Sequence, residues 1–365
     1  MSTADIAPAP FLSGVDTVVF VHGWNMTDGT QLNNAGNSDW KKASAETAFK
    51  RLYWQGFRGN YVAFDWPTFS DAEGPLAGSF DFLNLTYNAS EYQAWRSGQA
   101  LMDYLASIKS PEGSTYLLAH SMGNVVAAEA LRQWTASGHE DPIVTTYVAM
   151  QAAISAGAYG SNDQAAGAGD SETDLYRHWP YGVGSETTAD YYMAWSEDAA
   201  SKWVNMYNPL DAATDFAWGL NNGAKGGLLQ GTVWNWRYAW YPNRGGYLRG
   251  YYDQLVGTSE SHWVSEATLT AGLRLPDDLP GPGPSAYEAM AFLAQSKSKP
   301  VGTMNMEQQG DGRFSANYDV RALGLPAPYI DKWIGHSFQF YFDAVTTTSF
   351  WGTIRTETGF RSTLD

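Results

Sequence analysis

Apolar and polar positions follow two alternating patterns along the first 215 residues. Short apolar runs rich in β-branched residues predict buried strands at 15–24, 59–67, 114–120, 141–154 and 201–213. Stretches with helical spacing, at 39–57, 91–109 and 122–138, separate the first four of these runs. Such alternation predicts an α/β fold with a mostly parallel central sheet flanked by helices, and functional residues at the carboxyl ends of the strands.

The pattern changes at residue 216, which divides the chain into segments. We interpret residues 1–14 as an N-terminal linker, 15–215 as the first part of an α/β core, and 326–365 as its C-terminal part, a loop and a final helix. Residues 216–325 are a cap-like insertion rich in glycine and aromatic residues. We expect most of its aromatic cluster to fix the insertion to the core and one or two members to line a pocket mouth. The cluster comprises Trp234, Trp236, Tyr238, Trp240, Tyr241, Tyr247, Tyr251 and Tyr252.

Composition excludes several classes of function. A net charge of −16 disfavours nucleic acid as a partner, and the absence of cysteine excludes thiolate catalysis and disulfides.

We find no signal peptide and no apolar run long enough to span a membrane, so we expect a soluble chain. The proline-containing start fits a domain excised from a larger secreted protein, and the compartment stays open. The sequence has no residues at the spacing typical of metal ligands and no glycine-rich nucleotide-binding motif after a strand, so no metal and no cofactor is expected.

A candidate nucleophile lies where the predicted strand at 114–120 ends and the predicted helix at 122–138 begins. The sequence there is Ala119-His120-Ser121-Met122-Gly123. A strand that turns into a helix within one residue holds that residue at positive φ, and the close approach requires small side chains such as Ala119 and Gly123. The strained turn would lift the Ser121 hydroxyl above the sheet edge. The alternative is a serine that only caps the helix.

The strand at 15–24 ends in His22-Gly23-Trp24 beside that turn. A tetrahedral acyl intermediate needs two N–H donors for its oxyanion. We predict the backbone N–H groups of Trp24 and Met122 in that role, and a structural role for His22.

These motifs resemble the α/β-hydrolase superfamily in its lipase and esterase branch. The turn "AHSMG" resembles the Ala-x-Ser-x-Gly elbow of small bacterial lipases, with Ala119 where many members have glycine. The resemblance runs from about Val15 to Thr214 and resumes near Ala327, and it leaves out the aromatic insertion. It implies an α/β-hydrolase fold and the chain order serine, acid, histidine.

That order selects the other two catalytic candidates. His336, in "KWIGHSFQF", fits the base best, with His262 second among the six histidines. The last predicted strand ends near Tyr207, and a turn at Asn208-Pro209 brings Asp211 within reach of the sheet edge. For the acid we therefore favour Asp211 over Asp215 and the more distant Asp174. The competing interpretation of Asp211 is an ordinary helix N-cap.

Together these residues predict a carboxylic ester hydrolase with a Ser121–Asp211–His336 triad and a small-molecule or polymeric ester as substrate. An amidase or acyltransferase would use the same residues. A non-catalytic binding module on the same fold is the alternative outside catalysis.

Overall fold

The computed structural model describes residues 11–24, 40–67, 94, 97–154, 197–211, 213–214, 301–307 and 314–360. Within these ranges the strands are β1 (Thr17–Val21), β2 (Asn60–Phe64), β3 (Thr115–His120), β4 (Val144–Met150), β5 (Ala200–Tyr207) and β6 (Ala316–Asp319). The α-helices are α1 (Trp40–Trp54), α3 (Gly98–Ile108), α4 (Gly123–Ala136), α13 (Trp333–His336), α14 (Phe338–Tyr341) and α15 (Thr348–Thr358). Short 3-10 helices are η2 (Glu197–Ala199), η5 (Val301–Thr303), η7 (Val320–Leu323) and η8 (Ala327–Tyr329).

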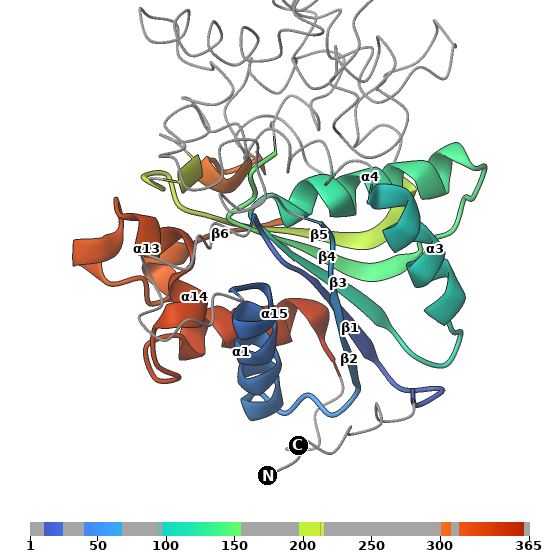
Figure 1. Cartoon of the computed structure of the whole chain (residues 1–365), viewed down its shortest axis with the longest axis horizontal. Helices are drawn as coiled ribbons and strands as arrows, with labels where there is room; N and C mark the ends of the chain where they lie inside the picture. The colour runs from blue at the N-terminus through green and yellow to red at the C-terminus, as the bar shows by residue number, and fades with distance from the viewer. Residues whose placement is uncertain are drawn as a thin grey trace, which may run out of the picture.

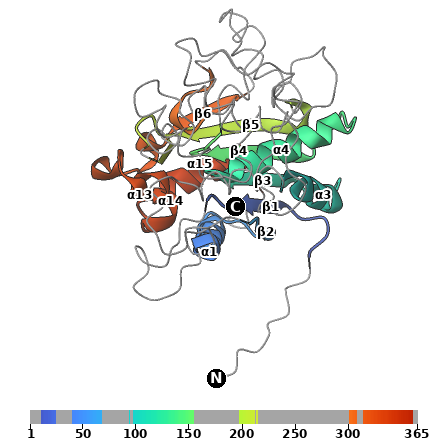
Figure 2. The same ribbon diagram turned by 45° about the horizontal axis from the view of Figure 1, so that its top comes forward.

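The strands of the described ranges form one sheet in the order β2-β1-β3-β4-β5-β6, and every neighbouring pair is parallel (Figure 2). Parallel neighbours need a crossover between them, and α1 and α4 supply the crossovers from β1 to β2 and from β3 to β4. This arrangement confirms the predicted α/β fold with a parallel sheet.

Helices cover both faces of the sheet, with α3 and α4 on one side and α1 and α15 on the other (Figure 1). Successive residues of a strand point to opposite faces. Val19 and Val21 of β1 accordingly pack into the core beneath α3 and α4, whereas Val18 and Phe20 pack with α1 and α15. Burial on both faces explains why the strands read as unbroken apolar runs.

Several elements differ in detail from the sequence-based expectation. β6 is part of the sheet although it lies within the range 216–325 assigned to the insertion; residues 215–300 lie outside the described residues. The loop expected to carry His336 instead contains the short helix α13, which ends at His336, and the final helix expected after it is divided into α14 and α15. No helix of the described ranges has the length and apolar character required to cross a bilayer.

Candidate active site

The turn between β3 and α4 has the predicted geometry. Ser121 has φ 52°, in the left-handed region, which costs a non-glycine residue roughly 1–2 kcal/mol. Its N–H donates to the carbonyl of Met150 over 3.0 Å, and its carbonyl accepts from the N–H of Ala153 over 3.0 Å and from the Asn124 side chain over 2.8 Å. The strained residue is therefore held by the end of the neighbouring strand β4 and by α4. A serine that only capped α4 would need neither the positive φ nor the hydrogen bonds to the end of β4.

Two glycines let the neighbouring backbone approach this turn. A Cβ atom on Gly123 would lie 2.4 Å from the carbonyl oxygen of His22, so only glycine lets α4 start against the end of β1. A Cβ atom on Gly23 would lie 2.8 Å from Cβ of Ser121. The chain after β1 therefore runs directly past Ser121, and Trp24 follows at the next position. Met122, at the N-terminus of α4, is fully buried.

His22 joins the segments that follow β1 and β2. Its Nδ1 lies 2.7 Å from the carbonyl oxygen of Gly23, its ring stacks on Trp66, and its Nε2 lies 3.2 Å from a carboxylate oxygen of Asp65. Hydrogen bonds from His22 and Lys41 lower the pKa of Asp65 to about 2. These contacts fit the structural role expected for His22 and hold the segment that leads to Trp24.

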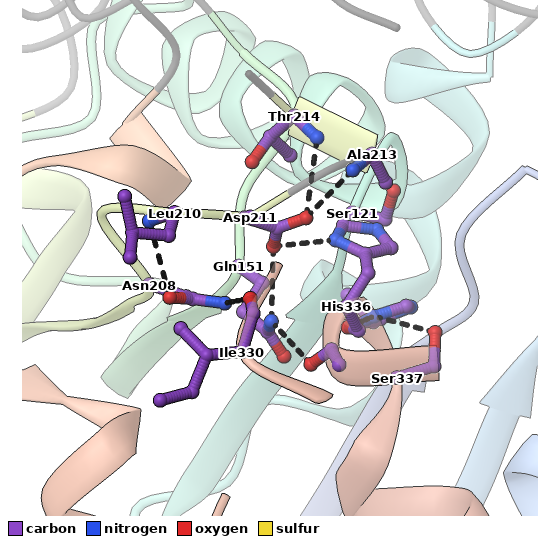
Figure 3. A network of polar contacts seen from close by, with 12 residues as sticks. Ser121, Gln151, Asn208, Leu210, Asp211, Ala213, Thr214, Ile330, His336 and Ser337 are labelled. Atoms are coloured by element: carbon purple, nitrogen blue, oxygen red, sulfur yellow. Dashed lines mark hydrogen bonds and ion pairs between the residues drawn. The ribbon is translucent and has the colours of Figure 1, made fainter. Parts of the chain in front are cut away.

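The acid and base candidates meet above the ends of β4 and β5. Nδ1 of His336 lies 2.8 Å from Oδ2 of Asp211, whose side chain is fully buried (Figure 3). The other oxygen, Oδ1, accepts the N–H groups of Ala213 over 2.9 Å and Thr214 over 3.2 Å. Asp211 therefore caps the following backbone and contacts the imidazole at the same time, so both interpretations drawn from the sequence apply to different oxygens of one residue.

Asn208 shapes the turn that carries Asp211. Its carbonyl accepts the Asp211 N–H over 3.1 Å, its own N–H donates to Gly302, and its side chain donates to the carbonyl of Ile330 over 2.8 Å. The fully buried Asn208 thus connects β5 both to η5 and to the C-terminal segment. The sequence indicated only a turn at this position.

His120 attaches the C-terminal segment to the serine turn. Its Nε2 lies 3.0 Å from the carbonyl oxygen of His336, so Nε2 carries the proton, and the two rings are 4.9 Å apart. Burial, together with the charge that His336 can carry, holds the pKa of His120 well below its usual range. His120 is therefore a neutral donor that holds the backbone of His336 against the residue that precedes Ser121.

Gln151 is a site residue that sequence reasoning missed. It follows β4 directly, is fully buried, and donates from Nε2 to Oδ2 of Asp211 and to the carbonyl of Gly335, each over 2.9 Å. Its signal in the sequence was a single glutamine within the apolar run predicted as a strand at 141–154; the structure ends β4 at Met150, so Gln151 lies at the strand end, where functional side chains gather.

The remaining candidates lie outside the described residues: His262, Asp174, Asp215 and the aromatic cluster at 234–252. In the described part of the chain, His, Asp and Glu side chains form no group of three suited to holding a metal ion.

Comparison with known proteins agrees with this arrangement. Residues 13–162, which include β1 to β4 and the Ser121 turn, match the family model described as "Alpha/beta hydrolase of unknown function (DUF900)". No curated protein and no solved structure matches the chain significantly.

Proposed function

Because the chain belongs to the α/β-hydrolase superfamily, we propose that it is a serine hydrolase that cleaves carboxylic esters through an acyl-enzyme on Ser121. The observation that carries the proposal is the 2.8 Å contact between Nδ1 of His336 and the buried carboxylate of Asp211, in a segment that His120 attaches to the strained Ser121 turn. A histidine oriented by a carboxylate next to a serine is the arrangement that activates a serine hydroxyl.

In the first half of the reaction the Ser121 hydroxyl oxygen attacks the ester carbonyl carbon. Nδ1–H of His336 donates to Asp211, so Nε2 is the nitrogen that takes the serine proton. The imidazolium then gives this proton to the alkoxide oxygen as the carbon–oxygen bond breaks. The alcohol leaves, and the acyl group stays on Ser121 as an ester.

In the second half water attacks the acyl-enzyme. His336 removes a proton from the water and returns it to the Ser121 oxygen, which releases the carboxylic acid and restores the enzyme. In both halves the carbonyl oxygen becomes an oxyanion. Backbone N–H groups of Trp24 and Met122 are the proposed donors, because both residues border Ser121, and one such donor lowers a barrier by about 2.7–4 kcal/mol.

The surroundings of Asp211 support its role as the ionised member. A buried carboxylate is costly unless hydrogen bonds replace its hydration. Asp211 accepts from two backbone N–H groups through Oδ1 and from the side chains of Gln151 and His336 through Oδ2. Its charge can therefore stay buried and stabilise the imidazolium as it forms.

The test is hydrolysis of p-nitrophenyl esters, from acetate to long acyl chains, by the wild type and Ser121→Ala. Ser137→Ala, at the exposed C-terminal end of α4, is the matched control. We expect the wild type and the control to be active and Ser121→Ala to lose activity. A fluorophosphonate probe should label the wild type, with the adduct on Ser121 by peptide mass spectrometry.

The outcomes separate the competing functions. Hydrolysis of p-nitroanilides, or faster ester turnover with added alcohols and amines than with water alone, would indicate an amidase or an acyltransferase. A folded wild type that neither hydrolyses esters nor reacts with the fluorophosphonate would refute the proposal and favour a binding module.

A further inference from the structure

Gln151 adopts an unusual backbone conformation beside the site. Its φ is 43°, and among the described non-glycine residues only Ser121 shares a positive φ. The two residues stand at the ends of adjacent strands, and the N–H of Ser121 donates to Met150, the residue before Gln151. A Cβ atom on Gly302 would lie 2.4 Å from the carbonyl carbon of Gln151, so η5 packs closely on this turn. The fold thus holds two strained turns side by side, and one of them carries the proposed nucleophile.

The side chain of Gln151 joins the acid to the segment of the base. The amide nitrogen Nε2 donates one hydrogen bond to Oδ2 of Asp211 and another to the carbonyl of Gly335, each over 2.9 Å (Figure 3). Gly335 directly precedes His336. Oδ2 is the same oxygen that contacts Nδ1 of His336. Gln151 therefore contacts the Asp211 carboxylate directly and the backbone of the residue that precedes His336.

The orientation of this carboxamide follows from chemistry. Both partners are acceptors, so the amino group must face them, and a flipped amide would set its oxygen against a carboxylate and a carbonyl. No donor of the described residues reaches Oε1 of Gln151 within hydrogen-bond distance. A buried acceptor without a partner is unfavourable, so packing alone does not account for a glutamine here.

We propose that Gln151 is a positioning residue that sets the distance and angle between Asp211 and His336. The inference rests on the proposed function, because a positioned acid–base pair matters only if His336 moves protons. Gln151 suits this task because one neutral amino group supplies two donors without adding charge next to the Asp211 carboxylate. Together with His120, which donates to the carbonyl of His336, it fixes two consecutive carbonyls of the segment that presents the imidazole.

The first test removes both donors and keeps the side-chain length. We expect Gln151→Met to lower kcat for p-nitrophenyl acetate by roughly 10- to 100-fold with little change in KM, because misplacing a reacting group by about 1 Å can cost that much. The matched control is Gln339→Met, which changes another fully buried glutamine, in α14. The control should stay within about twofold of the wild type in kcat.

A second variant reports on the charge beside Asp211. In Gln151→Glu the new carboxylate would repel Asp211, whereas its protonated form could donate one hydrogen bond. The ratio of its kcat to that of the wild type should therefore rise as the pH falls from about 8 to about 5, while the same ratio for Gln151→Met stays flat. A purely structural glutamine would not produce this difference between the two profiles.

A third measurement is independent of activity. The Nδ1 proton of His336, hydrogen-bonded to Asp211, should give a downfield proton resonance that moves or disappears in Gln151→Met and persists in Gln339→Met. Unchanged kcat and an unchanged resonance in Gln151→Met would overturn the proposal, whatever the melting temperature. If Gln151→Met does not fold, a flat pH ratio for Gln151→Glu overturns it. A wild type without hydrolysis or probe labelling refutes the proposed function, and the resonance still decides whether Gln151 holds the pair.

Discussion

His336 and Asp211 are 125 positions apart in the chain, yet Nδ1 of the histidine lies 2.8 Å from Oδ2 of the aspartate. The sheet produces this meeting, because β5 carries Asp211 to its carboxyl end while His120 and Gln151, at the ends of β3 and β4, hold the C-terminal segment above it. The contact gives His336 one defined tautomer, with the proton on Nδ1.

Asp211→Asn tests that tautomer directly. The amide can donate to Nδ1, which would move the ring proton to Nε2 and remove the lone pair that, in the proposed mechanism, takes the Ser121 proton. We expect kcat to fall by about 10,000-fold with the fold intact, as expected when a triad histidine takes the wrong tautomer. Ester hydrolysis and fluorophosphonate labelling should fall together.

The control for this substitution is Asp103→Asn, on the exposed face of α3, which should keep wild-type rates. Near-normal turnover by Asp211→Asn would remove Asp211 from the proposed triad and make Asp215 the next candidate.

The positive φ of Ser121 predicts that glycine is more stabilising than alanine at this position, the reverse of the usual order. At φ 52° alanine is strained and glycine is not, so Ser121→Gly should be more stable than Ser121→Ala by about 1 kcal/mol. Both variants lack the hydroxyl, so their difference isolates the backbone. Urea unfolding with equal m-values measures it.

Ser137 supplies the comparison at an ordinary backbone angle. It ends α4 with φ −80°, where glycine only adds freedom to the unfolded chain. Ser137→Gly should therefore be less stable than Ser137→Ala, the reverse of the order at Ser121. The same order at both positions would contradict a strained elbow.

The sequence could predict those parts of the site that depend on residues close together in the chain. The strand that precedes Ser121, the small residues around it and the position of Asp211 just after a strand are short-range signals, and the structure places these residues as expected. The contacts of Gln151 and Asn208 depend on which strand ends become neighbours and on where the C-terminal segment lies. Those are long-range facts, and neither residue belongs to a local motif.

The final segment shows a second limit. The sequence predicted a loop at His336 followed by one final helix, whereas the structure has α13 within the expected loop and divides the helix into α14 and α15. At this end of the chain the backbone follows tertiary contacts, such as the hydrogen bond from His120 to the carbonyl of His336, more than intrinsic helix propensity.

Gly123→Ala should separate α4 from the end of β1. The added Cβ would lie 2.4 Å from the His22 carbonyl oxygen and 2.7 Å from that of Val21, and backbone atoms cannot rotate away. We expect a loss of about 1–3 kcal/mol in unfolding free energy and a lower kcat, because the shift displaces Met122 and Ser121. Thermal and urea unfolding measure the first effect, and ester hydrolysis the second.

Gly352→Ala is the matched control for the added methyl group. Gly352 lies inside α15, and its added Cβ would come no closer than 3.8 Å to Gln55. Removing glycine from a helix interior should stabilise the protein by about 0.5–1 kcal/mol and leave kcat unchanged. Equal effects of the two substitutions would refute the close approach at Gly123.

His120 predicts a loss of stability on mild acidification. Burial, with the nearby His336, holds the pKa of His120 well below 6.5 in the folded protein, whereas the unfolded chain binds a proton near pH 6.5. The contribution of neutral His120 to the free energy of unfolding is therefore complete above pH 6.5 and decreases as the pH falls, by up to about 1.4 kcal/mol per pH unit.

His120→Gln, whose amide can still donate toward the His336 carbonyl, should flatten the dependence of unfolding free energy on pH between about 7 and 5. His139→Gln, at an exposed position after the end of α4 where the ring stacks on Trp134, is the matched control. A slope in His120→Gln equal to the wild-type slope would show that His120 takes up a proton in the folded protein, and then it could not be the neutral donor that holds His336.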